Sequence, residues 1–111
     1  MSNTSAHEVI RVWRGETDVA GAAVYFAHVT GPVAAELATL PGFRGLSVWR
    51  RTTGAAVEFV VTTRWTSMAA IAAFAGADVT RAVVEPAARA VLTRFDETAS
   101  HFDVVFESAA D

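Results

Sequence analysis

The sequence predicts an α+β fold of the ferredoxin-like class, in which helices cover one face of an antiparallel sheet. Alternating apolar and polar residues mark the expected strands, and apolar residues spaced three or four apart mark the helices. The elements follow the order strand, helix, strand, strand, helix, strand, which is the split β-α-β arrangement. The 111 residues fit one domain over residues 1–111, with its core expected over residues 9–107.

The first half of the chain predicts a strand over residues 9–13, a helix over 18–40 and a strand over 43–51. Asp18 is a suitable N-cap, because a short acidic side chain can accept hydrogen bonds from first-turn N–H groups. Pro32, which follows a glycine, lacks a backbone donor, and we expect a kink or two shorter helices there. The apolar face of the helix is expected to consist of Val19, Ala22, Phe26, Val29, Val33, Leu37 and Leu40.

The middle of the chain predicts a β-hairpin, with its turn over residues 52–55 and the third strand over 57–65. The short connection makes this pair antiparallel. A helix over 67–75 follows, with Ser67 as its N-cap. Gly76 is suited to end it, because glycine tolerates a positive φ.

The last third of the chain predicts a short turn over residues 78–84, a helical piece over 86–94 and a final strand over 101–107. Proline is favoured as a first helical residue, so Pro86 marks the start of the helical piece. The third and the final strand each combine an apolar face with a mixed one. We expect the apolar faces to pack against the helices.

The composition excludes several classes of site. There is no cysteine, which excludes disulfides and cysteine-bound zinc. All nine basic residues are arginine and the net charge is −3, so neither a Schiff-base lysine nor a nucleic-acid-binding surface is expected. No apolar run is long enough to span a membrane, and the N-terminal residues do not read as a signal peptide. We therefore expect a cytoplasmic protein.

The hydrophobic content of 52% is high for so small a chain and predicts a homodimer. The mixed face of the third strand carries Glu58, Val60, Thr62 and Arg64. Such a face can be solvated, or it can close against a second sheet with its charges paired. The surplus of apolar residues favours the second arrangement, a homodimer formed through the sheet face.

Three stretches of the sequence are informative in combination. They are Leu-Pro-Gly-Phe-Arg-Gly at residues 40–45, Trp-Thr-Ser leading to Ala-Phe-Ala-Gly-Ala-Asp over residues 65–78, and His-Phe-Asp-Val at residues 101–104. Their order and spacing resemble the antibiotic biosynthesis monooxygenase family of dimeric α+β barrel proteins. The resemblance implies a cofactor-independent monooxygenase that acts on small phenol-, quinol- or polyketide-like aromatic compounds.

The resemblance does not extend to every branch of that family. The haem-degrading branch places an asparagine on the first strand and a histidine on the second helix, and neither residue is present at those places here. The quinol-oxidising branch has a pocket asparagine, whereas the only asparagine of this chain is Asn3. Trp65, in contrast, occupies the place of a pocket tryptophan in such oxygenases.

A cofactor-free oxygenase must bind a flat ring, stabilise its anion and exclude water. Tryptophan rings can stack on a substrate, arginine can stabilise a phenolate, and histidine can accept a proton. The candidate catalytic residues are Trp65, Arg50 and Tyr25, and the candidate substrate-binding residues are Trp49, His28 and Phe74.

Most of these residues also have a purely structural interpretation. Tyr25 can simply pack, with its hydroxyl in contact with water. Trp65 and Trp49 can be packing residues of their strands, and Arg50 can be a solvated charge. His28 lies about 200° around the helix from Phe26, which predicts a position near solvent.

The histidines predict no metal site. His7, His28 and His101 lie on separate elements, and we expect no metal and no cofactor. His101 is expected to pair with a carboxylate in the subunit interface. Two functions stay open: the monooxygenase, and a non-catalytic dimeric barrel that binds a small ligand or acts as an accessory subunit. The family resemblance favours the first, and the lack of a recognisable acid–base motif favours the second.

Overall fold

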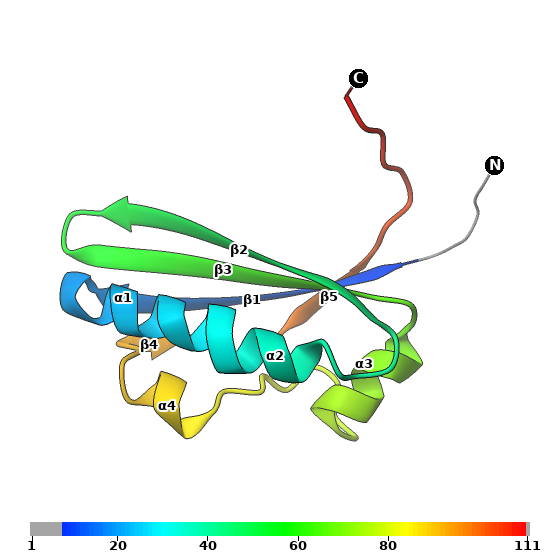
Figure 1. Ribbon diagram of the computed structural model, residues 1–111, viewed down its shortest axis with the longest axis horizontal. Coiled ribbons are helices and arrows are strands. Elements are labelled where there is room, and N and C mark those ends of the chain that lie inside the picture. Colours follow the sequence, from blue (N-terminus) through cyan, green and yellow to red (C-terminus); the bar gives the residue numbers. More distant parts are fainter. Residues whose placement is uncertain (1–7, 111) are drawn as a thin grey trace.

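Helices cover one face of a five-stranded antiparallel sheet in the computed structural model (Figure 1). The structure describes residues 8–110, so Asn3 and His7 lie outside it. The strands are β1 (Val9–Asp18), β2 (Phe43–Thr53), β3 (Ala56–Trp65), β4 (Arg94–Phe95) and β5 (Ser100–Asp103). Their order is β2-β3-β1-β4, and β5 also pairs with β1. The predicted ferredoxin-like fold is confirmed.

β1 is twice as long as the sequence predicts. It pairs with β3 from Val9 opposite Trp65 to Asp18 opposite Ala56. The strand therefore continues directly to the N-cap of the first helix. Its side chains alternate between the two faces of the sheet, so Val9, Arg11 and Trp13 lie on the helix-covered face.

The first helical segment runs without a break through α1 (Val19–His28), the π-helical turn η1 (Val29–Val33) and α2 (Ala34–Leu37). Asp18 caps it as predicted, accepting a hydrogen bond of 2.7 Å from the Gly21 amide. A kink or two shorter helices are expected at Pro32, and there a π turn separates α1 from α2. The wider turn accommodates a residue that cannot donate the usual helical hydrogen bond.

The inward face of this segment differs from the predicted one at two positions: Val19 is exposed, and Tyr25 takes the place of Phe26. Tyr25 is 3% exposed, whereas Phe26 is 48% exposed and Val19 is 62% exposed. The buried stripe therefore runs through Tyr25 and Val29. His28, three residues after Tyr25, turns toward the sheet instead of solvent, with a side chain only 13% exposed.

The second main helix, α3 (Met68–Ala75), has the predicted ends. The Ser67 hydroxyl accepts a hydrogen bond of 3.1 Å from the Ala70 amide, and Gly76 follows with φ of +96°. The turn that leads into β2 packs against this helix. Its Gly42 has φ of +82°, and a Cβ there would lie 2.5 Å from the Cβ of Ala70. Only glycine fits that position.

The C-terminal elements are shorter than predicted. The helix α4 (Pro86–Arg89) starts at the predicted proline but has only four residues. It cannot reach residue 94, because Arg94 and Phe95 form β4 opposite Glu16 and Gly15 of β1. The final strand stops at Asp103, and the chain beyond it runs away from the sheet (Figure 1).

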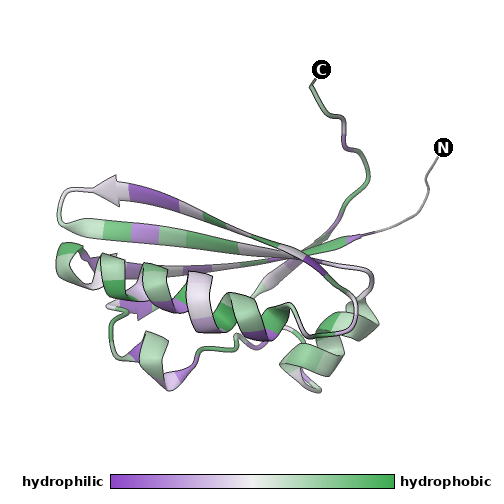
Figure 2. Ribbon diagram, viewed as in Figure 1, coloured by the Kyte–Doolittle hydropathy of each residue, from purple (hydrophilic) through white to green (hydrophobic). Residues whose placement is uncertain are grey.

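The core lies between the sheet and the helices in two clusters. One contains Tyr25, Val29, Val57, Phe59 and Ala88, and the other contains Val9, Leu37, Trp65 and Ile71. Hydrophobic residues dominate α1 and β3, whereas a hydrophilic stretch lies near the end of β2 (Figure 2). Among the described residues, no helix has the length and apolar content that crossing a membrane requires.

Candidate active site

A cavity of about 100 Å³ lies between the sheet and the helices. Its walls come from β1, β3, the α1–η1–α2 segment, α3 and the segment before α4. The π turn supplies two apolar wall residues, Val29 and Val33. Exposed residues such as Glu36 and Val83 also line the cavity, so its mouth lies on their side.

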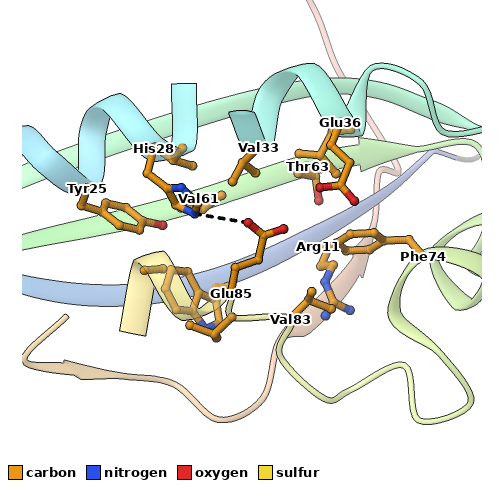
Figure 3. A pocket seen from close by; sticks show the side chains of 15 residues that line it. Arg11, Tyr25, His28, Val33, Glu36, Val61, Thr63, Phe74, Val83 and Glu85 are labelled. Carbon is orange, nitrogen blue, oxygen red and sulfur yellow. Dashed lines mark ion pairs between the residues drawn. The ribbon is translucent and has the colours of Figure 1, made fainter. Parts of the chain in front are cut away.

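Three polar side chains meet on one side of this cavity (Figure 3). The Nε2 atom of His28 lies 3.5 Å from Oε1 of Glu85. The Tyr25 ring lies beside His28, with 6.4 Å between the ring centroids. Burial raises the pKa of Tyr25 well above its ordinary value, so its hydroxyl stays protonated at neutral pH. That hydroxyl has no hydrogen bond to another residue within 8–110, which leaves it available as a donor.

Aromatic side chains form two further walls. The Trp13 ring folds over Gly15, where a Cβ would lie 2.6 Å from the indole. The indole N–H donates a hydrogen bond of 2.8 Å to the Asp96 carbonyl and so fixes the ring. Phe74 of α3 forms the other wall and stacks on Trp65, with 5.4 Å between ring centroids. Flat apolar walls of this kind suit a flat aromatic ligand.

A guanidinium lies on the far side of the cavity from Tyr25 (Figure 3). Arg11 is 5% exposed, and its Cζ lies 5.7 Å from the centroid of the Phe74 ring. Burial lowers its pKa from the ordinary value, but an arginine side chain remains charged at neutral pH. The cavity therefore combines a cation, a histidine–carboxylate pair and a phenol donor.

The structure brings together three of the six candidate residues, namely Tyr25, His28 and Phe74. Trp65 does not line the cavity. It is fully buried behind Phe74, and its indole N–H donates a hydrogen bond of 2.8 Å to Thr63 Oγ1. Alternation correctly placed Trp65 on the inner face, but the packing of α3 closes that face over it.

Arg50 and Trp49 of β2 also lie outside the cavity. Arg50 pairs with Phe59 and shares the helix-covered face, but β2 is an edge strand and the side chain is exposed. Trp49 points to the opposite face and is 60% exposed. Neither residue shares a pocket with Tyr25.

Arg11, Trp13 and Glu85 line the cavity but were not predicted as site residues. The sequence could have indicated Arg11, because it lies between Val9 and Trp13 on the apolar face of the predicted strand, where a charged residue is unusual. Glu85 had no such signal, since it lies in an irregular segment where no periodicity applies. The expectation for the final strand was wrong: the His101 ring faces Arg11 on the inner face instead of a carboxylate, whereas Phe102, expected to pack against the helices, points to the outer face and is 58% exposed.

No three His, Asp or Glu side chains come together as metal ligands within the part of the chain that the structure describes. The His28–Glu85 pair is the one histidine–carboxylate ion pair among residues 8–110. The side chains that line the cavity can accept a proton, donate hydrogen bonds and stack on a ring.

Comparison with known families places most of this region within a recognised domain. The profile of the family described as "Antibiotic biosynthesis monooxygenase" matches residues 20–86, which include most of the cavity walls. A search of curated proteins finds no match.

Several solved structures share the fold. An antibiotic biosynthesis monooxygenase structure from Bacillus cereus is 18% identical, covers 95% of this chain and 100% of its own, and has a TM-score of 0.67. The haem-degrading MhuD of Mycobacterium tuberculosis is 26% identical, covers 91% of this chain and 99% of its own, and has a TM-score of 0.58. SnoaB, a cofactor-independent oxygenase from Streptomyces nogalater, is 23% identical, covers 94% of this chain and 97% of its own, and has a TM-score of 0.56.

Proposed function

Because this chain belongs to the antibiotic biosynthesis monooxygenase family, we propose that it is a cofactor-independent monooxygenase of small phenol- or quinol-like aromatic compounds. The observation that carries the proposal is the His28–Glu85 pair, which lies beside the Tyr25 hydroxyl in an otherwise largely apolar cavity. Such a site can remove a phenolic proton and hold the resulting anion. Trp13 and Phe74 provide the surfaces on which the ring packs.

The proposed reaction starts when the His28–Glu85 pair accepts the phenolic proton. The imidazolium that forms is stabilised by the Glu85 carboxylate, and the Tyr25 hydroxyl donates a hydrogen bond to the substrate anion. The anion transfers one electron to O₂, and the substrate radical and superoxide then combine into a peroxide. The peroxide forms at a ring carbon that carries one hydrogen in the phenol form, and the imidazolium of His28 returns its proton to the outer peroxide oxygen. That hydroxyl and the hydrogen on the carbon leave together as water, and the carbon becomes a carbonyl. One substrate and one O₂ thus give one carbonyl product and one water.

Oxygen uptake tests this proposal directly. With a panel of anthrones and hydroquinones, we expect one O₂ to be consumed per product formed, without added metal or flavin. Tyr25→Phe is expected to slow turnover by about tenfold, because the substrate anion loses one hydrogen bond. Phe26→Leu, on the exposed side of the same helix, is the matched control and should retain the wild-type rate. Equal rates for Tyr25→Phe and wild type would remove Tyr25 from the proposed mechanism.

A second function is favoured by the size of the cavity. A volume of about 100 Å³ encloses at most about one ring, which suits a non-catalytic barrel that binds a small ligand or serves as an accessory subunit. Saturable binding of the panel compounds with no oxygen uptake would support that function over the oxygenase.

The outer face of the sheet supports a homodimer as part of the proposal. Trp49, Val60 and Phe102 point to this face, and Trp49 and Phe102 are 60% and 58% exposed. Several of its charges are already paired within the chain: for example, Glu58 accepts a hydrogen bond of 2.9 Å from Arg51 Nε. An apolar patch with neutralised charges is suited to burial against a second copy. The cytoplasmic location stays a prediction.

Trp49→Glu is expected to raise the dimer dissociation constant by at least about tenfold, because it places an unpaired carboxylate in an apolar interface. Light scattering at micromolar concentration should give about twice 11.8 kDa for wild type and a mass falling toward 11.8 kDa for the variant. Arg50→Glu places the same side chain one residue along, on the other face of β2, and should stay dimeric. A wild-type mass of 11.8 kDa would rule out the dimer.

A further inference from the structure

Arg11 is the most unusual charged residue of the inner face. It lies between Val9 and Trp13 on β1, and its side chain enters the space between the sheet and α3. Two backbone carbonyls hold its guanidinium: Nη1 donates to Val79 at 2.6 Å, and Nη2 donates to Arg81 at 2.8 Å. His101 Nε2 lies 2.9 Å from Nη1. The position of the cation is therefore fixed from two sides.

All three of these partners are neutral. Burial and the nearby charge of Arg11 lower the pKa of His101, so its ring is uncharged at neutral pH and accepts the arginine hydrogen bond. No carboxylate of residues 8–110 lies within 4.0 Å of Arg11 in an ion pair. A buried charge is costly unless an opposite charge compensates it. Within the described chain, the positive charge of Arg11 lacks that compensation.

The guanidinium also has unused donors. An arginine side chain has five N–H groups, and the three contacts occupy both hydrogens of Nη1 and one of Nη2. The Nε–H and one Nη2–H have no acceptor among residues 8–110. Binding the segment 79–81 and His101 of β5 to the sheet accounts for the three contacts, and an uncharged amide could make similar ones. It does not account for the charge or for the two remaining donors.

We infer that Arg11 binds an anionic group of the ligand, and that the pocket takes aromatic carboxylates in preference to neutral aromatic compounds. Phe74 lies beside Arg11 and offers its ring to the ligand ring, with the carboxylate directed at the guanidinium. Tyr25, His28 and Glu85 lie on the other side of the pocket (Figure 3). A hydroxyl at the far end of the ring would reach them, so this inference names the substrate class within the proposed oxygenase and rests on that function.

Glu36 is the residue that opposes this arrangement. It also lines the pocket, and Figure 3 places it on the same side as Arg11 and Phe74. Glu36 is exposed, so water screens its repulsion of a bound carboxylate more than it screens the attraction of the buried Arg11. Replacing Glu36 should therefore strengthen anion binding, whereas replacing Arg11 should abolish the preference.

The test compares 4-hydroxybenzoate with its neutral analogue 4-hydroxybenzamide by calorimetry without oxygen. For wild type we expect the benzoate to bind at least about tenfold more tightly. The preference is the dissociation constant of the benzamide divided by that of the benzoate. Arg11→Gln should lower this ratio to about one, and Arg11→Lys should preserve part of the preference. Glu36→Gln should increase the ratio. If Arg11→Gln does not fold, the wild-type ratio and Glu36→Gln still decide the question.

Equal binding of the two probes by wild type, binding of neither at millimolar concentration, or an unchanged ratio in Arg11→Gln would each overturn the inference. The measurement involves no turnover. If the protein prefers the benzoate but consumes no oxygen, the anion site is supported and the oxygenase function is ruled out. If the protein oxidises neutral hydroquinones but shows no preference for the benzoate, the oxygenase function is supported and the anion site is ruled out.

Discussion

Replacing His28 with glutamine is expected to lower the kcat of aromatic oxidation by about 100-fold, the lower end of the usual contribution of a general base. Glutamine retains the length and a hydrogen-bonding group, but it cannot accept the phenolic proton. Since the aromatic walls and Arg11 are unchanged, KM should stay within about threefold of wild type. Steady-state oxygen uptake measures both constants.

Two further variants identify the source of that loss. Ala27→Gln places the same side chain one residue earlier on the exposed face of α1, and it should retain wild-type kcat. Glu85→Gln should cost less than about tenfold, because the Glu85 side chain is 41% exposed and a partly solvated ion pair contributes little. A His28→Gln enzyme with wild-type kcat, or a loss of the same size in Ala27→Gln, would contradict a proton-accepting role for His28.

The error of one residue on α1 shows where sequence periodicity reaches its limit. Phe26 lies four residues after Ala22 and three before Val29, whereas Tyr25 lies three after Ala22 and four before Val29. Both spacings fit the same helical stripe, so periodicity cannot choose between two adjacent aromatic residues. Packing against Phe59, whose ring centroid lies 4.9 Å from that of Tyr25, makes the choice. His28 becomes a pocket residue as a consequence.

Alternation on β3 and helix capping were more reliable, because both depend on short-range geometry, but alternation on β5 did not reveal which of its faces turns toward the helices. Asp18, Ser67 and Pro86 act at the helix starts that the sequence predicts. Alternation also placed Trp65 correctly on the inner face of β3. It could not reveal how deeply Trp65 lies, since that depends on Phe74, from a different element. Glu85 depends on the path of an irregular segment and has no local signal.

Trp65→Ala is expected to lower the free energy of unfolding by about 3–5 kcal/mol, the usual cost of removing a large buried aromatic ring. Trp65 is fully buried, packs edge-on against Phe43 and stacks on Phe74. Its loss leaves a cavity at the junction of β1, β3 and α3. Urea unfolding at one fixed protein concentration measures the change, because the stability of a dimer depends on concentration.

Trp65→Phe separates a packing role from a role in catalysis. Phenylalanine retains most of the buried apolar surface but loses the hydrogen bond to Thr63, so we expect a smaller loss of about 1–2 kcal/mol. As Phe74 separates Trp65 from the cavity, kcat and KM should change little in the folded variant. A Trp65→Phe protein of wild-type stability whose kcat falls by about tenfold or more would make Trp65 a site residue after all. A destabilised protein with normal turnover fits the packing seen behind Phe74.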